Sequence, residues 1–121
     1  MESAKKRSLK QNRYRHGVVV KTVMDEMNKE LAEKGCEYRL KPEDVDLFIK
    51  ENALGIAHRI QTSIGEFIIQ GKLKTRSTRD FEEAMEQVRA YFAQTKKPIY
   101  IPLPGEVMNL DEQYKDNLNR F

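Results

Sequence analysis

The sequence predicts an α+β domain in which three helices pack with a short antiparallel β-hairpin, followed by a proline-rich extended segment. Two long stretches carry apolar residues at the three- and four-residue spacing of a helix. Between them, β-branched and aromatic residues lie on both sides of Ile64-Gly65, as in two strands joined by a turn. With 121 residues the chain can form one core. We therefore expect a flexible basic arm at 1–7, a single domain at 8–106 and a polar tail at 107–121.

The first helix is expected to begin at about Leu9, because Ser8 and Gln11 match a capping box. Its apolar face would consist of Val20, Val23, Met24, Met27 and Leu31. Gly35 suits the left-handed conformation that often follows a helix end, so the helix is predicted to run to Lys34.

The second helix is expected to begin at Pro42, whose missing N–H would have no partner in the first turn. Its buried side would consist of Val45, Phe48, Ile49 and Ala53, and Gly55 would end it. The hairpin is predicted between His58 and Leu73, with its turn near residues 63–66.

The third helix is the most strongly patterned segment of the chain. Ser77 or Thr78 can cap it, and its apolar face would consist of Phe81, Met85, Val88 and Phe92. Pro98, Pro102 and Pro104 then exclude a helix and favour an extended run from Ile99 to Leu103.

Positive charge is concentrated in two segments, although the net charge of the chain is only +3. Residues 1–21 hold seven Lys and Arg against one acid, Glu2, and residues 58–79 hold five against Glu66. Clustered cations bind polyanions because they release counterions from phosphates. The two segments predict a nucleic-acid partner; a solvated surface with a basic leader is the alternative.

Candidate DNA-binding residues come from both basic segments. Single strands are held by cations along the phosphates and by planar side chains against the bases, so Tyr14 is the candidate stacking residue, with packing in the core as its alternative. Gln11 and Asn12 could form hydrogen bonds with nucleic acid, with helix capping as the alternative for Gln11 and a bond to a neighbouring loop as the alternative for Asn12. Hydroxyls and N–H groups at the start of the third helix could bind a phosphate. The full set is Lys5, Lys6, Arg7, Lys10, Gln11, Asn12, Arg13, Tyr14, Arg15, Lys72, Lys74, Arg76 and Arg79.

Catalytic, metal and cofactor motifs are absent from the sequence. His16 and His58 have no partner at metal-ligand spacing, and the single cysteine, Cys36, cannot form an internal disulfide. No phosphate-binding glycine loop or nucleophile elbow is present. The carboxylates that could form a two-metal site stand where helix starts favour acids: Asp44, Asp46, Asp80, Glu82 and Glu83. We expect a binding protein that uses no cofactor and is not an enzyme.

The run Arg7-Ser8-Leu9-Lys10-Gln11-Asn12-Arg13 resembles the opening R-S-L-x-Q-N-R signature of the phage recombination family NinB, also called Orf. Residues 70–92, with Ser77-Thr78-Arg79-Asp80-Phe81-Glu82 leading into the third helix, are similar to that family's strand, turn and C-terminal helix. The resemblance implies a divergent phage or prophage relative. It also implies a homodimeric mediator that binds single-stranded DNA, cooperates with the host single-strand-binding protein and helps to load a recombinase.

These observations together predict a recombination accessory protein that binds single-stranded DNA. One alternative is a protein-interaction module of a replication or recombination complex; another is a small structure-specific nuclease. No run of 18 apolar residues or signal-peptide pattern is present, so we expect no membrane contact and a location in the cytoplasm of a bacterial host.

Overall fold

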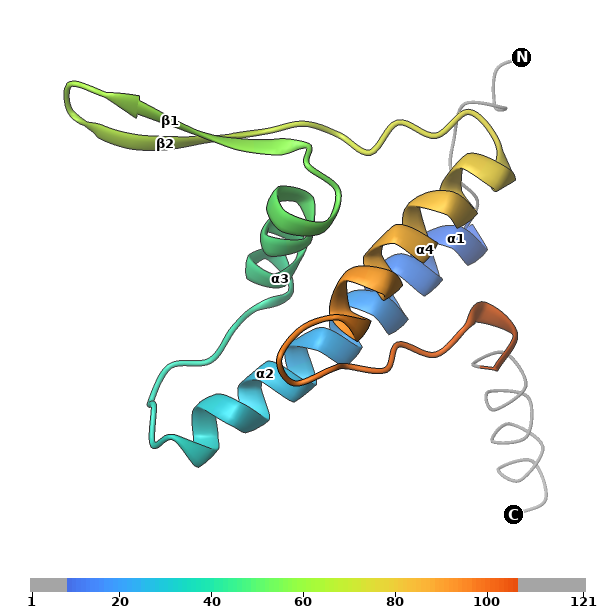
Figure 1. Cartoon of the computed structure of the whole chain (residues 1–121), viewed down its shortest axis with the longest axis horizontal. Coiled ribbons are helices and arrows are strands. Elements are labelled where there is room, and N and C mark those ends of the chain that lie inside the picture. The colour runs from blue at the N-terminus through green and yellow to red at the C-terminus, as the bar shows by residue number, and fades with distance from the viewer. Residues whose placement is uncertain (1–8, 107–121) are drawn as a thin grey trace.

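The computed structural model describes residues 9–106, which form three helices and one two-stranded antiparallel sheet (Figure 1). The predicted α+β class is confirmed. The first helix comprises α1 (Leu9–Tyr14), the π-helical segment η2 (Arg15–Val20) and α2 (Lys21–Glu33), and the second comprises α3 (Pro42–Phe48) and the π-helical segment η3 (Ile49–Ala53). Strands β1 (Ala57–Thr62) and β2 (Gly65–Gln70) precede α4 (Thr78–Ala93). The predicted arm at 1–7, Ser8 of the capping box and the tail at 107–121 lie outside the described residues.

The first helix follows the predicted span but contains an unpredicted π-helical segment. Gly17 and the three valines that follow it are weak α-helix formers, so this stretch departs readily from α-helical geometry. The helix ends as predicted at Gly35, whose φ of 77° is left-handed and whose N–H donates to the Ala32 carbonyl at 3.1 Å. Asn28 then fixes the following loop, because its side-chain amide exchanges two hydrogen bonds with the backbone of Leu40.

The second helix begins at Pro42, as predicted, and Asp44 accepts a hydrogen bond from the Lys41 N–H at 2.8 Å. Val45 and Ile49 are buried. The prediction for Phe48 was wrong, because its side chain is 44% exposed. Its ring lies at the edge of the contact with α4, 6.2 Å from the rings of both Tyr91 and Phe92, and solvent reaches its other side.

The hairpin extends away from the helices, as Figure 1 shows, and Ala57 is the one buried residue in its two strands. The register pairs His58 with Ile69, Arg59 with Ile68 and Ile60 with Phe67. Gly65 closes the turn with a φ of 143°, a backbone conformation that glycine adopts without a side-chain clash.

The third helix, α4, buries its predicted face of Phe81, Met85, Val88 and Phe92. Ser77 is the N-cap, and its side chain accepts a hydrogen bond from the Asp80 N–H at 3.1 Å. Residues 98–103 belong to no helix or strand and place Ile99 and Ile101 in the core, and residues 104–106 form a helical turn that begins at Pro104. The core lies between the first helix, the second helix, α4 and this returning segment.

Candidate nucleic-acid interface

The first basic segment divides into exposed and buried parts. Asn12 and Arg13 of α1 are exposed, Gln11 is half-buried, and Tyr14 and Arg15 are buried. The predicted contacts Lys5, Lys6 and Arg7 lie outside the described residues, and Lys10 belongs to α1 without a described side chain. Arg13 is therefore exposed and forms no ion pair with a described residue, whereas Lys21, also exposed, pairs with Asp25 at 2.9 Å.

The prediction that Tyr14 stacks on a base was wrong, because only 6% of its surface is exposed. Its hydroxyl donates a hydrogen bond to the Pro102 carbonyl at 2.8 Å and accepts one from Arg89 Nη1 at 2.8 Å. The Arg89 guanidinium also lies 5.9 Å from the centre of the tyrosine ring. Tyr14 thus joins α1 to α4 and to the C-terminal segment, the alternative role that its sequence position left open.

Arg15 is likewise not available to DNA. It is 7% exposed, and its Nη2 lies 3.0 Å from Asp46 Oδ1, while Lys50 Nζ lies 3.3 Å from the other carboxylate oxygen of Asp46. A buried guanidinium requires such a partner because removal of the charge from water is costly. The pairing fixes the first helix against the second.

Burial raises the pKa of Tyr14 above its usual value, and the hydrogen bond from Arg89 opposes the shift only in part. The folded protein then holds the phenol proton at a pH where the unfolded chain loses it. This contribution to the free energy of unfolding is complete below about pH 10 and is lost as the pH rises further. We expect Tyr14→Phe to flatten the decline in urea-derived stability between pH 9 and 11. Tyr38→Phe, which alters an exposed ring, should leave the decline unchanged; equal curves for both variants would contradict this role of Tyr14.

The cations of the second basic segment that follow the hairpin are accessible. Lys72, Lys74 and Arg76 are exposed and alternate with the half-buried Leu73 and Thr75, so an extended backbone presents the three cations together. Their side chains form no ion pair with any residue between 9 and 106. Arg79, on the first turn of α4, forms an ion pair with the exposed Glu83 at 3.2 Å.

The start of α4 is already capped by the protein itself. Ser77 accepts from the Asp80 N–H, and the Asp80 carboxylate accepts from the Arg76 N–H at 3.0 Å. A phosphate at this helix start would meet the negative charge of Asp80. The capping role of Ser77 is therefore confirmed, and the cations of the preceding segment are better placed to meet a phosphate than the helix end is.

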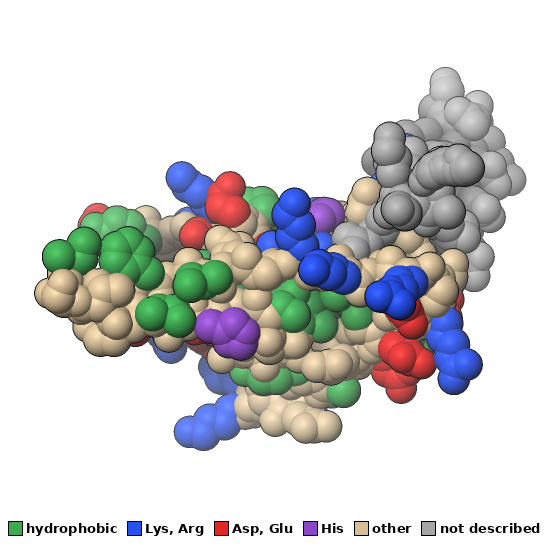
Figure 2. Space-filling model, turned by 90° about the horizontal axis from the view of Figure 1, so that it is seen from above, with side chains coloured by type: hydrophobic (Ala, Val, Ile, Leu, Met, Phe, Trp, Pro, Cys, Tyr) green, Lys and Arg blue, Asp and Glu red, His purple; other side chains and the backbone are tan. Residues whose placement is uncertain are grey.

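The fold brings the two basic segments to one end of the helical body. Figure 1 shows the first helix and α4 running in the same direction from the same end of the helical body, and the Tyr14–Arg89 hydrogen bond joins the end of α1 to a later turn of α4. Seen from above in Figure 2, Lys and Arg side chains gather on the face that follows the hairpin. The start of the first helix and the segment that leads into α4, which both carry exposed cations, thus lie at the same end of the helical body although they are far apart in sequence.

The sequence prediction missed a set of exposed apolar residues on the hairpin: Ile60, Ile64, Phe67, Ile68 and Ile69. The alternation around a two-residue turn places Ile60, Phe67 and Ile69 on one face, and this could have been found from the register. The sequence pattern did not show which face of the hairpin lies toward the helices.

Four of the five carboxylates considered for catalysis have partners in the structure, Glu83 pairing with Arg79, whereas Glu82 is exposed. Asp44 caps the second helix, Asp46 pairs with Arg15 and Lys50, and Asp80 caps α4. Within the described part of the chain, no group of three or more His, Cys, Asp or Glu is arranged to hold a metal ion.

No protein-family model, curated protein or solved structure matches this chain. Among residues 9–106, no helix is both long and apolar enough to cross a membrane.

Proposed function

We propose that this protein binds single-stranded DNA through the five exposed cations Arg13, Lys72, Lys74, Arg76 and Arg79, which we call the basic end. The observation that supports the proposal is that the start of the first helix and the segment leading into α4 lie at the same end of the helical body, although residues 22–57 separate the two basic segments in sequence. Four of the five cations form no ion pair with a described residue, so phosphates would not have to displace an internal partner. Asn12, exposed beside Arg13, can add a hydrogen bond.

The resemblance of residues 7–13 and 70–92 to the NinB family extends this proposal. It would make the protein a recombination accessory factor of phage type, acting as a homodimer in the cytoplasm of a bacterial host. Its partners would be the host single-strand-binding protein and a recombinase. In that role the basic end holds the strand, and Lys5, Lys6, Arg7 and Lys10 precede it in the chain and would add further phosphate contacts.

The direct test is fluorescence anisotropy of a labelled single-stranded oligonucleotide across a salt series. Each phosphate neutralised on a single strand contributes about −0.7 to the slope of log affinity against log salt. Five contacts therefore give a slope of about −3.5 or steeper. A DNA duplex of the same length serves as the comparison. A flat response to salt, or no binding at low salt, would contradict the proposal.

A further inference from the structure

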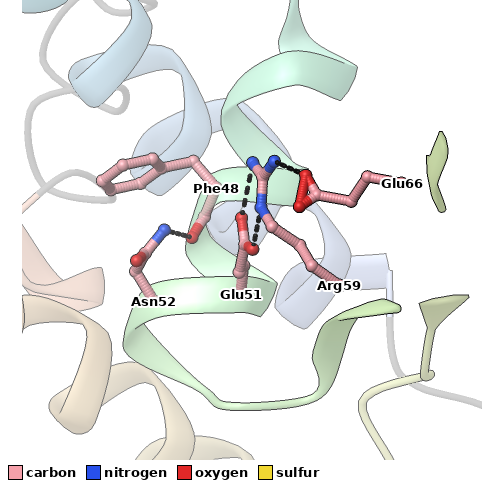
Figure 3. A network of polar contacts seen from close by, with 5 residues as sticks. All are labelled: Phe48, Glu51, Asn52, Arg59 and Glu66. Atoms are coloured by element: carbon pink, nitrogen blue, oxygen red, sulfur yellow. Dashed lines mark hydrogen bonds and ion pairs between the residues drawn. The ribbon is translucent and has the colours of Figure 1, made fainter. Parts of the chain in front are cut away.

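The two faces of the hairpin have different surroundings. Residues directly opposite in an antiparallel ladder share a face, so Arg59 lies with Ile68, whereas Ile60 lies with Phe67 on the other side. Figure 3 shows Arg59 reaching Glu51 of η3 and Glu66 of β2, with the Glu66 bond at 3.2 Å. The face of the hairpin that carries Arg59 therefore lies toward the second helix.

A second contact holds the hairpin in the same orientation. Lys50 Nζ of η3 donates to Gln70 Oε1 at 3.4 Å, and Gln70 pairs with Ala57 on the Arg59 face. The opposite face, formed by His58, Ile60, Phe67 and Ile69, therefore points away from the helices. We call it the outer face.

The outer face is apolar and uncovered by any described residue of the chain. Ile60 is 43% exposed, Phe67 50% and Ile69 56%. Figure 2 shows these hydrophobic side chains gathered over the hairpin, with a histidine beside them. A contiguous apolar patch of this kind marks a binding surface, and two strands alone are marginally stable in water.

The positive charge next to the outer face indicates which ligand binds there. β2 ends at Gln70 and the chain continues directly into Lys72, Lys74 and Arg76, so the apolar outer face and the unpaired cations are contiguous. A single nucleic-acid strand offers both complements, because its bases expose apolar planes and its backbone carries the phosphates. A second copy of this chain offers an apolar face but brings the same positive segment with it.

We infer that the outer face is the base-stacking platform for single-stranded DNA, with Phe67 as the stacking residue and Ile60, Ile69 and His58 supporting the neighbouring base. The inference rests on the proposed single-strand binding and assigns the base contact that Tyr14 cannot make. A DNA strand would run from the start of α4 along Arg76, Lys74 and Lys72 onto the hairpin. Duplex DNA, whose bases are stacked on one another, would lose this contact.

The test compares two labelled strands of equal charge, one of oligothymidylate about 12 nucleotides long and one of abasic residues of the same length. The wild-type protein is expected to prefer the strand with bases by about fivefold or more, since one base stacked on an aromatic ring raises affinity by about that factor at least. Phe67→Ala should abolish the preference while affinity for the abasic strand stays unchanged. Phe67→Tyr should retain it.

Tyr38→Ala is the matched control, because it removes an aromatic ring that is 73% exposed elsewhere in the chain. It should leave the preference intact. Circular dichroism shows whether each variant is folded, and sedimentation equilibrium shows whether it associates.

Equal wild-type affinity for the two strands would overturn the platform and leave phosphate binding standing. No affinity for either strand would overturn both proposals. A wild-type dimer that Phe67→Ala dissociates without changing the base preference would show that a second copy covers the outer face, which would also overturn the inference.

Discussion

Replacing Lys72, Lys74 and Arg76 together by glutamine is expected to weaken single-strand binding about 100-fold at 0.1 M salt. Three lost phosphate contacts remove about 2 from the salt slope, which corresponds to about two decades of affinity between 0.1 M and the 1 M reference. Glutamine keeps the side chains long and polar, and none of the three makes an ion pair with a described residue, so the fold should be unaffected. Anisotropy across the salt series measures both changes.

A second triple variant controls for the general loss of charge. Lys29, Lys41 and Lys96 are exposed and lie away from the basic end, near the end of α2, before α3 and after α4. Their replacement by glutamine reduces the net charge equally but should change affinity much less. Equal losses in the two triple variants would mean that net charge, rather than the basic end, attracts the strand.

Asp46→Ala is expected to lower the free energy of unfolding by about 3 kcal/mol, because it leaves the guanidinium of Arg15 buried without its partner. Lys50, which shares the carboxylate, is also largely buried and loses its contact as well. Urea denaturation followed by circular dichroism measures the change.

Two further variants isolate the cause. Asp25→Ala removes an exposed ion pair with Lys21 and should cost under about 0.5 kcal/mol. Replacing both partners by apolar residues, as in Arg15→Met with Asp46→Leu, should restore part of the stability, since the buried guanidinium is then gone and only Lys50 still lacks its carboxylate partner. A double variant as unstable as Asp46→Ala would show that packing, rather than the unpaired charge, explains the loss.

Local sequence signals predicted the elements of the fold well. Gly35 ended the first helix, Pro42 began the second, and Ser77 capped α4, because each of these roles depends on the conformation or side chain of one residue and its near neighbours. The hairpin followed from β-branched residues around a turn. Such signals act over a few residues and can be recognised in a single sequence.

The candidate site was less predictable, because exposure is decided by contacts between distant segments. Tyr14 and Arg15 follow Arg13 directly and share its basic surroundings in sequence, yet the helical turn directs them to Arg89 and Asp46 in the core. Phe48 matched a buried helix face but lies at the edge of its contact with α4. Phe67 resembled an ordinary strand residue until the contacts of Arg59 showed which face of the hairpin turns outward.

The sequence by itself therefore determined the α+β class, the order and ends of the helices, the hairpin and the two basic segments, since all of these follow from local conformation and composition. Only the tertiary structure decided which cations remain exposed, that the two basic segments meet at one end, and which face of the hairpin is uncovered. Those properties depend on how helices distant in sequence pack around the shared core, and no short stretch of residues specifies that packing.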